Sequence, residues 1–167
     1  MKIELIEVPE SQKSVLRNML ELYEYDMSVY TDEELNDCGL YGYKYFDYYW
    51  NEEKRFPYFI KCENVLCGFV LVNDYCYTLK GEEAMSIAEF FIMNKYRRFG
   101  IGRKIARQIF DLFPGKWEVN QVPGNDISYV FWEKVIDEYT QGNYEKSVID
   151  TESGKRQSIV FSNKNQA

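Results

Sequence analysis

Anion-binding residues are concentrated in one short stretch of this sequence, between Lys95 and Arg107. It contains Gly100 and Gly102, and it lies between a predicted apolar strand and a predicted helix. Its charged residues are all cationic, namely Lys95, Arg97, Arg98, Arg103, Lys104 and Arg107. A helix N-terminus offers unpaired N–H groups and a partial positive charge, and glycines let the backbone approach an anion closely. The stretch therefore predicts a phosphate site; the alternative is a solvated, charged helix start without a ligand.

The overall charge favours a compact phosphorylated ligand over a nucleic acid. The chain has 20 Lys+Arg and 27 Asp+Glu, a net charge of -7; without the six cations of the stretch, 14 cations face 27 acids, a net of -13. A nucleic-acid track requires a broader basic face, so we expect no nucleic-acid partner. A P-loop is excluded because no Gly-Lys-Ser/Thr follows the glycines. A dinucleotide fingerprint fits badly, because Ile105 stands where its third glycine would be.

A candidate general base lies in the strand that precedes this stretch. Glu89 is the lone carboxylate in "SIAEFFIM", residues 86–93, which are otherwise suited to burial. A desolvated carboxylate has a raised pKa, which suits it to accept a proton directly or through water. The alternative role is a carboxylate at the edge of a pocket that attracts a cationic substrate or pairs with an arginine.

Histidine is absent from the chain, which excludes Ser-His-Asp and Cys-His catalysis by its own residues. The cysteines Cys38, Cys62, Cys67 and Cys76 form no C-x-x-C pair. A zinc site without histidine would need a thiolate cluster, so we expect no metal site. We expect these cysteines to be reduced thiols packed in or near the core.

Aromatic residues are dense in "LYGYKYFDYYW", residues 40–50, which follows the acidic "TDEELND" at 31–37. One interpretation is a short helix whose aromatic face covers the core. The other is a pocket wall for a cationic ligand, formed by the rings, the neighbouring carboxylates and the loop from Tyr75 to Glu83. Both can hold together.

Hydrophobic periodicity predicts one α/β domain over residues 1–167. Strands are predicted at 2–8, 57–62, 65–74, 84–93, 116–122, 143–150 and 156–162, with a hairpin turn at Glu63-Asn64. Helices are predicted at about 11–30, 101–113 and 125–139, besides the short aromatic one. Their expected apolar faces include Val15, Leu16, Met19, Leu20, Leu22 and Tyr23, then Ile101, Ile105, Ile109, Phe110 and Phe113, then Ile127, Val130, Phe131, Val135 and Ile136.

No segment of the sequence resembles a targeting or membrane signal. "MKIELIEVPE" places acids among its apolar residues, and no apolar run approaches the ~20 residues that span a bilayer. We therefore expect a cytoplasmic protein that has no membrane partner.

Two motifs resemble those of the GNAT superfamily, the Gcn5-related N-acetyltransferases. Arg97-Arg98-Phe99-Gly100-Ile101-Gly102 matches R/Q-x-x-G-x-G/A, and the segment 125–132 resembles N-x-x-A-x-x-F-Y. The resemblance implies that family's fold: a mixed, mostly antiparallel sheet of about seven strands with splayed fourth and fifth strands, flanked by about four helices. It also implies transfer of acetyl from acetyl-CoA to an amine by direct attack in a ternary complex.

The resemblance further implies a cofactor site. The backbone from Arg98 to Arg103, through Phe99, Gly100, Ile101 and Gly102, would hold the pyrophosphate, with Arg97 adding local charge. The backbone near Ile92 and the side chain of Asn125 would bind the pantetheine arm. The acidic chain favours a cationic amine acceptor, a small molecule or a peptide, and a homodimer is possible. The alternative function is an acyl-CoA-binding module that has lost catalytic transfer.

The family's usual general acid is missing. Trp132 replaces the motif's Tyr, and an indole N–H cannot release a proton usefully; Ser128 replaces its Ala. Tyr129, one helical turn earlier, is the candidate replacement. Otherwise Trp132 packs against the cofactor or the core, and the thiolate leaves to solvent. The motif does not assign the general base either, so the assignment of that role to Glu89 depends on its position in the strand alone.

Overall fold

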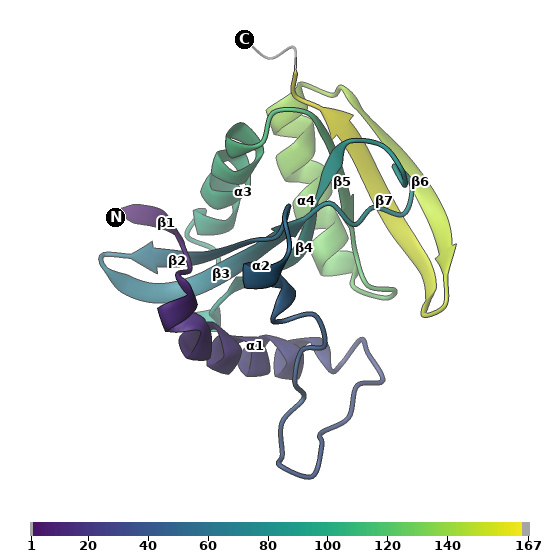
Figure 1. Ribbon diagram of the computed structural model, residues 1–167. Helices are drawn as coiled ribbons and strands as arrows, with labels where there is room; N and C mark the ends of the chain where they lie inside the picture. Colours follow the sequence, from purple (N-terminus) through teal and green to yellow (C-terminus); the bar gives the residue numbers. More distant parts are fainter. Residues whose placement is uncertain (1, 165–167) are drawn as a thin grey trace.

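A seven-stranded mixed sheet organises the protein in the computed structural model, which describes residues 2–164 (Figure 1). The strand order is β1-β2-β3-β4-β5-β7-β6; only β4 and β5 are parallel neighbours. The strands are β1 (Ile3–Glu7), β2 (Phe56–Cys62), β3 (Val65–Asn73), β4 (Ala84–Ile92), β5 (Lys116–Asn120), β6 (Tyr144–Thr151) and β7 (Gly154–Ser162). The helices are α1 (Lys13–Met27), α2 (Tyr48–Asn51), α3 (Ile101–Leu112) and α4 (Asp126–Thr140), with 3-10 turns at Glu10–Gln12 and Asn94–Tyr96. The predicted fold class is confirmed.

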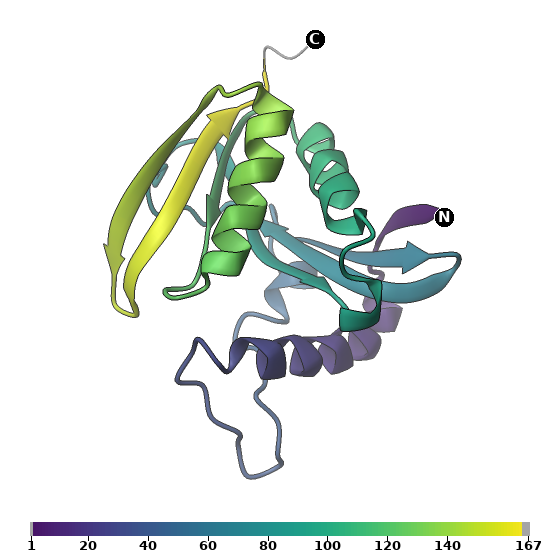
Figure 2. The ribbon, with the colours of Figure 1, turned by 180° about the vertical axis from the view of Figure 1, so that it is seen from behind.

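Helices cover both faces of the sheet, and each face has its own apolar core. Figure 2 shows α3 and α4 side by side over one face, where Phe110 and Trp117 are fully buried. α1 and α2 cover the other face, where Leu16 packs with Phe69. Burial of large apolar side chains on both sides of one sheet is the main stabilising term of such a fold.

Three residues that were assigned to apolar helix faces are exposed instead. Leu22 of α1 is 51% exposed, because the buried stripe follows Leu16, Met19 and Leu20 at helical spacing and Leu22 lies off it. Ile127 and Val130 of α4 are 80% and 62% exposed. They lie in the first turns of α4, and the buried part of this helix begins only at Trp132.

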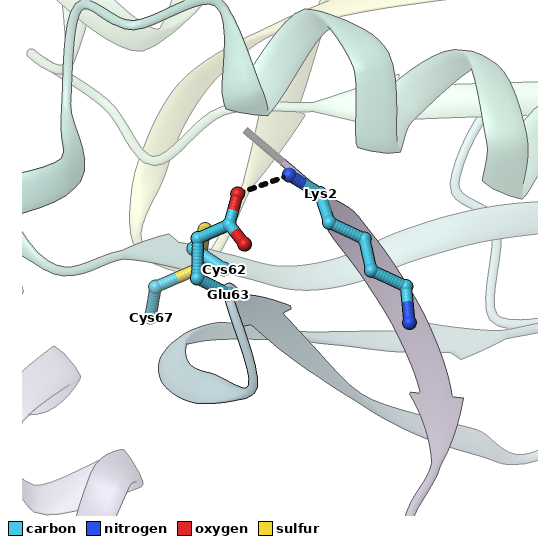
Figure 3. Close-up of a disulfide and its surroundings, with 4 residues drawn as sticks. All are labelled: Lys2, Cys62, Glu63 and Cys67. Carbon is cyan, nitrogen blue, oxygen red and sulfur yellow. Dashed lines mark hydrogen bonds between the residues drawn. A yellow bond between two sulfur atoms is a disulfide. The ribbon is translucent and has the colours of Figure 1, made fainter.

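The hairpin of β2 and β3 contains a disulfide that the sequence did not predict. Glu63 and Asn64 form the expected two-residue turn, with φ of 49° and 66°. Cys62 lies just before this turn and Cys67 lies after it, and the two are bonded to each other (Figure 3). The expectation of reduced thiols is wrong for this pair, because pairing of the strands brings their Cα atoms to 6.1 Å, within disulfide range. The other two cysteines are free.

The parallel strands β4 and β5 separate after a short paired segment. Ala84, Met85 and Ser86 pair with residues 116–118, whereas β4 continues to Ile92 on the β3 side alone. The two halves of the sheet consequently run in different directions (Figure 1). This confirms the predicted splay, and it leaves backbone groups of β4 without a ladder partner on one side.

The segment 31–56 serves both purposes that its composition suggests. Phe46 and Tyr49 are buried in the core beneath α1, at 4% and 3% exposure. Tyr43, Tyr45 and Tyr48 face a cavity instead. Only residues 48–51 are α-helical, so most of the segment is irregular and depends on tertiary contacts for its position.

Candidate active site

A cavity of about 910 Å³ lies where β4 and β5 separate. Residues 86–89 of β4 and Asn120 at the end of β5 form its floor; α1, the segment 31–48, the β3–β4 loop and β7 contribute its walls. Seven tyrosines line it: Tyr23, Tyr41, Tyr43, Tyr45, Tyr48, Tyr75 and Tyr77. Its volume suits a ligand of the size that protein pockets usually hold.

Glu89 projects into this cavity, and two tyrosine hydroxyls hold its carboxylate. Tyr43 Oη donates to Glu89 Oε1 at 2.9 Å, and Tyr23 Oη donates to Oε2. Burial raises the pKa of Glu89, while the two hydroxyl hydrogen bonds and the charge of Arg156 oppose that rise. A carboxylate offers about four lone-pair positions, so two donors leave space for a third that enters the cavity. Glu89 is thus placed to bind an ammonium group or to accept its proton.

The charged side chains around the cavity are of both signs: Glu24, Glu33, Glu89, Lys44, Arg55 and Arg156. Burial raises the pKa of Glu24 to about 7, and the charges of Glu89 and Glu33 add to the rise. Arg55 is already paired with Glu52, whose Oε2 lies 3.4 Å from its Nε. Besides Glu89, the cavity therefore contains a second carboxylate with a raised pKa, and that of Glu24 is about 7.

Two carboxylates outside the cavity, those of Glu118 and Glu21, position loops that form its walls. Glu118 of β5 is fully buried and accepts hydrogen bonds of 2.8–2.9 Å from the backbone N–H groups of Tyr77, Thr78 and Leu79. Glu21 of α1 likewise accepts from the backbone N–H groups at positions 41 and 42. Loops that carry cavity tyrosines are thus fixed by charge-assisted bonds to regular elements.

The glycine stretch forms the start of α3, as predicted. Gly100 occupies the N-cap position with φ of 75°, and no side chain caps the helix, so its first amides have no protein partner of that kind. Nothing lies within 4 Å of the position that a Cβ on Gly100 would take. A Cβ on Gly102 would instead lie 3.1 Å from the Phe131 ring. Phe99 is 68% exposed and Ile101 is buried, so the backbone before α3 faces open space while the helix itself is anchored in the core.

Arg97 joins the end of β4 to α1 rather than extending freely. Its Nε donates to the Ile92 carbonyl at 2.7 Å, and its guanidinium pairs with Asp26. Met93 N–H donates to the Cys67 carbonyl of β3. The backbone groups of successive residues in a strand point to opposite edges, so those of Phe90 and Ile92 point toward the gap between β4 and β5. The Ile92 carbonyl is occupied by Arg97, which leaves its N–H facing the gap.

The predicted residues of α4 lie apart from Glu89. Asn125 is the N-cap of α4: its Oδ1 accepts from Ser128 N–H at 3.1 Å, and its Nδ2 lies 3.9 Å from the sulfur of Met27. Tyr129 lines a separate small cavity with Asn125. Trp132 is only 4% exposed and packs against aromatic rings of the core, which agrees with one of its two expected roles.

The splayed sheet and the glycine-opened helix agree with the fold that the two sequence motifs imply. The model of the acetyltransferase (GNAT) family matches residues 19–137, well over half of the 167 residues. The chain belongs to this family, whose members are acetyl-CoA-dependent N-acetyltransferases. No curated protein sequence matches it significantly.

Solved acetyltransferase structures share the fold. An acetyltransferase from Thermus thermophilus has a TM-score of 0.71 at 11% identity, with 98% of each chain covered. AAC(6')-Ib, solved with paromomycin and acetyl-CoA, has a TM-score of 0.70 at 15% identity, covering 97% of this chain and 94% of that one. Naa50 from Arabidopsis thaliana, solved with the bisubstrate analogue CoA-Ac-MVNAL, has 0.63 at 14% identity, covering 98% and 100%. At these identities the likeness shows the fold alone.

Several residues of the site carried no sequence signal. Glu24, Tyr23 and Arg156 lie in ordinary helix and strand patterns, and Glu118 is one acid within a short strand. The signals that pointed toward the cavity were the tyrosines at 40–50, the carboxylates at 31–37, Glu89 and the loop from Tyr75 to Glu83. Within residues 2–164 no group of three or more potential ligands could hold a metal ion. No helix in the same range is long and apolar enough to cross a membrane.

Proposed function

We propose that this protein transfers the acetyl group of acetyl-CoA to an amine that binds in the tyrosine-lined cavity, by direct attack in a ternary complex. The observation that carries the proposal is the position of Glu89. It is the carboxylate that projects from β4 at the gap between β4 and β5, with its two oxygens held by Tyr23 and Tyr43. Family membership supports acetyl transfer in general.

The start of α3 and the gap fit acetyl-CoA, which supplies the activated acetyl group. The uncapped amides from Arg98 to Arg103, with the left-handed Gly100 among them, would hold its pyrophosphate. The free Ile92 N–H and the Asn125 amide would bind the extended arm. Arg97 contributes by fixing the end of β4 through its bond to the Ile92 carbonyl.

Glu89 would act as the general base. An alkylamine with a pKa near ~10 enters as an ammonium ion, and it must lose a proton before it attacks. A carboxylate whose pKa is raised by burial is a better proton acceptor than an exposed one. Glu24, in the same cavity, would receive the proton next, because its pKa of about 7 allows exchange with solvent near neutral pH.

Backbone groups in the gap would stabilise the charge that develops on the acetyl oxygen. The N–H group of Phe90 faces the gap where β4 has no ladder partner, next to the Ile92 N–H that would bind the extended arm. Fixed donors of this kind cost no reorganisation during the reaction. Thiolate release proceeds without a Trp132 contribution, since that side chain is packed in the core.

A panel of amines, assayed for acetyl-CoA-dependent thiol release, tests the proposal. We expect one class of amine to stimulate release, and Glu89→Gln to lower kcat by about 100-fold or more, the usual range for loss of a general base. Glu145→Gln, on the exposed face of β6, is the matched control and should leave kcat unchanged. Binding of acetyl-CoA with no amine-stimulated release would instead favour a binding module, an alternative consistent with Trp132 in place of the usual Tyr.

A further inference from the structure

Arg156 is a cation in the cavity wall without a carboxylate partner. Its Nη2 donates to the neutral Ser153 Oγ at 3.2 Å, and its Nε is buried without any hydrogen-bond partner. None of the ion pairs within residues 2–164 includes it. An N–H donor that is removed from water, as the Nε of Arg156 is, is costly unless an acceptor compensates it. The compensation for Arg156 is therefore incomplete in the protein itself.

The position of Arg156 is fixed although no carboxylate of the described residues lies within ion-pair distance of it. Its Cζ lies 5.6 Å from the centroid of the Tyr77 ring, a cation–π contact. Tyr77 is in turn held by its backbone N–H, which donates to Glu118 Oε1 at 2.9 Å. The guanidinium is thus held against an anchored ring at the cavity wall, where a planar fork can bind a carboxylate or phosphate through two hydrogen bonds.

The distribution of charge argues against an acceptor that carries positive charge alone. Glu24, Glu33 and Glu89 would attract an ammonium group, but a polycation that filled the cavity would also approach Arg156 and Lys44. Lys44 stacks on Tyr45, with Nζ 5.4 Å from the ring, and it takes part in no ion pair within the described chain. A ligand with one charge of each sign would satisfy both parts of the wall.

We propose that the acceptor is zwitterionic: its amine lies at Glu89, and an oxyanion on the same molecule, a carboxylate or a phosphate, binds Arg156. This inference rests on the proposed function for the amine, and it narrows the acceptor from amines in general to amino acids or amino-phosphates. The cavity excludes the glycine stretch, since none of residues 97–103 lines it, so the oxyanion site is distinct from the proposed pyrophosphate site.

Matched acceptors separate this proposal from a simple amine site. Cadaverine and lysine, tyramine and tyrosine, and agmatine and arginine differ only by a carboxylate; ethanolamine and phosphoethanolamine differ only by a phosphate. In at least one pair we expect kcat/KM to be about tenfold or more higher for the anionic member, the scale of a charge-assisted bidentate contact. If the amino acids show this preference, the oxyanion is a carboxylate; if phosphoethanolamine shows it, the oxyanion is a phosphate.

Variants assign the preference to Arg156. Arg156→Gln should raise KM for the anionic acceptor by about tenfold and change KM for the partner that lacks the oxyanion by less than about threefold. Arg156→Lys should retain part of the preference. Arg17→Gln is the matched control: this exposed arginine of α1 also lies against an aromatic ring, that of Phe46, but it does not line the cavity. Equal kcat/KM for both members of every pair, or an equal loss on both with Arg156→Gln, would overturn the proposal.

A binding measurement separates failure of this inference from failure of acetyl transfer. The affinity of the same acceptors is measured by titration calorimetry, with the protein saturated with desulfo-coenzyme A. Selective binding of anionic members that Arg156→Gln abolishes supports the oxyanion site even if no acceptor is acetylated. The absence of any such selectivity contradicts it even if transfer to simple amines is observed.

Discussion

Tyr43 Oη donates a hydrogen bond of 2.9 Å to Glu89 Oε1, although 46 positions separate the two residues in the sequence. The bond joins the irregular segment 31–47 to the central strand β4. The position of the cavity wall and the protonation of the proposed base are therefore physically linked. A change in one of these residues should alter the titration of the other.

Tyr43→Phe tests this link through the pH dependence of activity. The hydroxyl hydrogen bond lowers the pKa of Glu89, so removing it raises that pKa further. A base acts only when ionised, and the acidic limb of the kcat/KM profile should therefore move to higher pH. We expect the loss of activity to be largest on the acidic limb and to become much smaller as pH rises above it. Tyr25→Phe, at a 72% exposed position on α1, should leave the profile unchanged; an unshifted limb in Tyr43→Phe would exclude Glu89 as the titrating base.

Glu24→Gln should stabilise the protein in a pH-dependent way. The folded-state pKa of Glu24 is about 7, above its ordinary value of 4.5, so the folded state holds a proton that the unfolded state releases. Stability is therefore lost as pH rises from about 4.5 to 7 and stays lost above it. Glutamine is neutral throughout, so the Tm of the variant should exceed that of the wild type by a margin that grows between pH 5 and pH 8. Glu145→Gln supplies the comparison, and a constant margin would contradict the assigned titration.

Glu118→Gln should loosen the loop that carries Tyr77. The buried carboxylate accepts three backbone N–H bonds, and a neutral amide cannot accept all of them equally well. We expect a stability loss of about 1–3 kcal/mol, faster amide exchange at residues 77–79 and a higher KM for the acceptor. KM for acetyl-CoA should stay near the wild-type value. If KM for acetyl-CoA rose as much as KM for the acceptor, the substitution would disturb the whole sheet.

Gly100→Ala should weaken acetyl-CoA binding. Its φ of 75° is strained for a residue with a Cβ, by about 1–2 kcal/mol, and relief of that strain would tilt the amides that precede α3. We expect KM for acetyl-CoA to rise about tenfold. Gly142→Ala has a similar φ of 83° after α4, so it should cost similar stability and leave KM unchanged. Equal KM in the two variants would place the pyrophosphate elsewhere.

Tyr129→Phe tests the remaining candidate for the general acid. Tyr129 lines a small cavity with Asn125 instead of the one that contains Glu89. We therefore expect kcat to fall by less than about threefold, with the thiolate leaving unassisted. A loss of about 100-fold, the usual size of a general-acid contribution, would assign the acid to Tyr129 after all.

The sequence located the regular elements and the glycine stretch because their signals are local. A period-two alternation predicted the first strand and a nearly continuous apolar run predicted β4. Ile101, Ile105 and Ile109 at helical spacing predicted the buried face of α3. Gly100 and Gly102 could be placed at a helix start because capping involves neighbouring residues alone. Leu22 was misassigned since apolar character does not by itself say which side of a helix meets the sheet.

Contacts between distant segments required the tertiary structure. The bonds of Glu89 to Tyr23 and Tyr43 span 66 and 46 positions, and those of Glu118 to the loop span 39 to 41. No local pattern encodes such pairs, because they form only when the sheet brings the strands together. The sequence by itself determined the elements, the glycine stretch and the lone carboxylate of β4; only the tertiary structure decided which tyrosines hold that carboxylate and that Arg156 lines the same cavity.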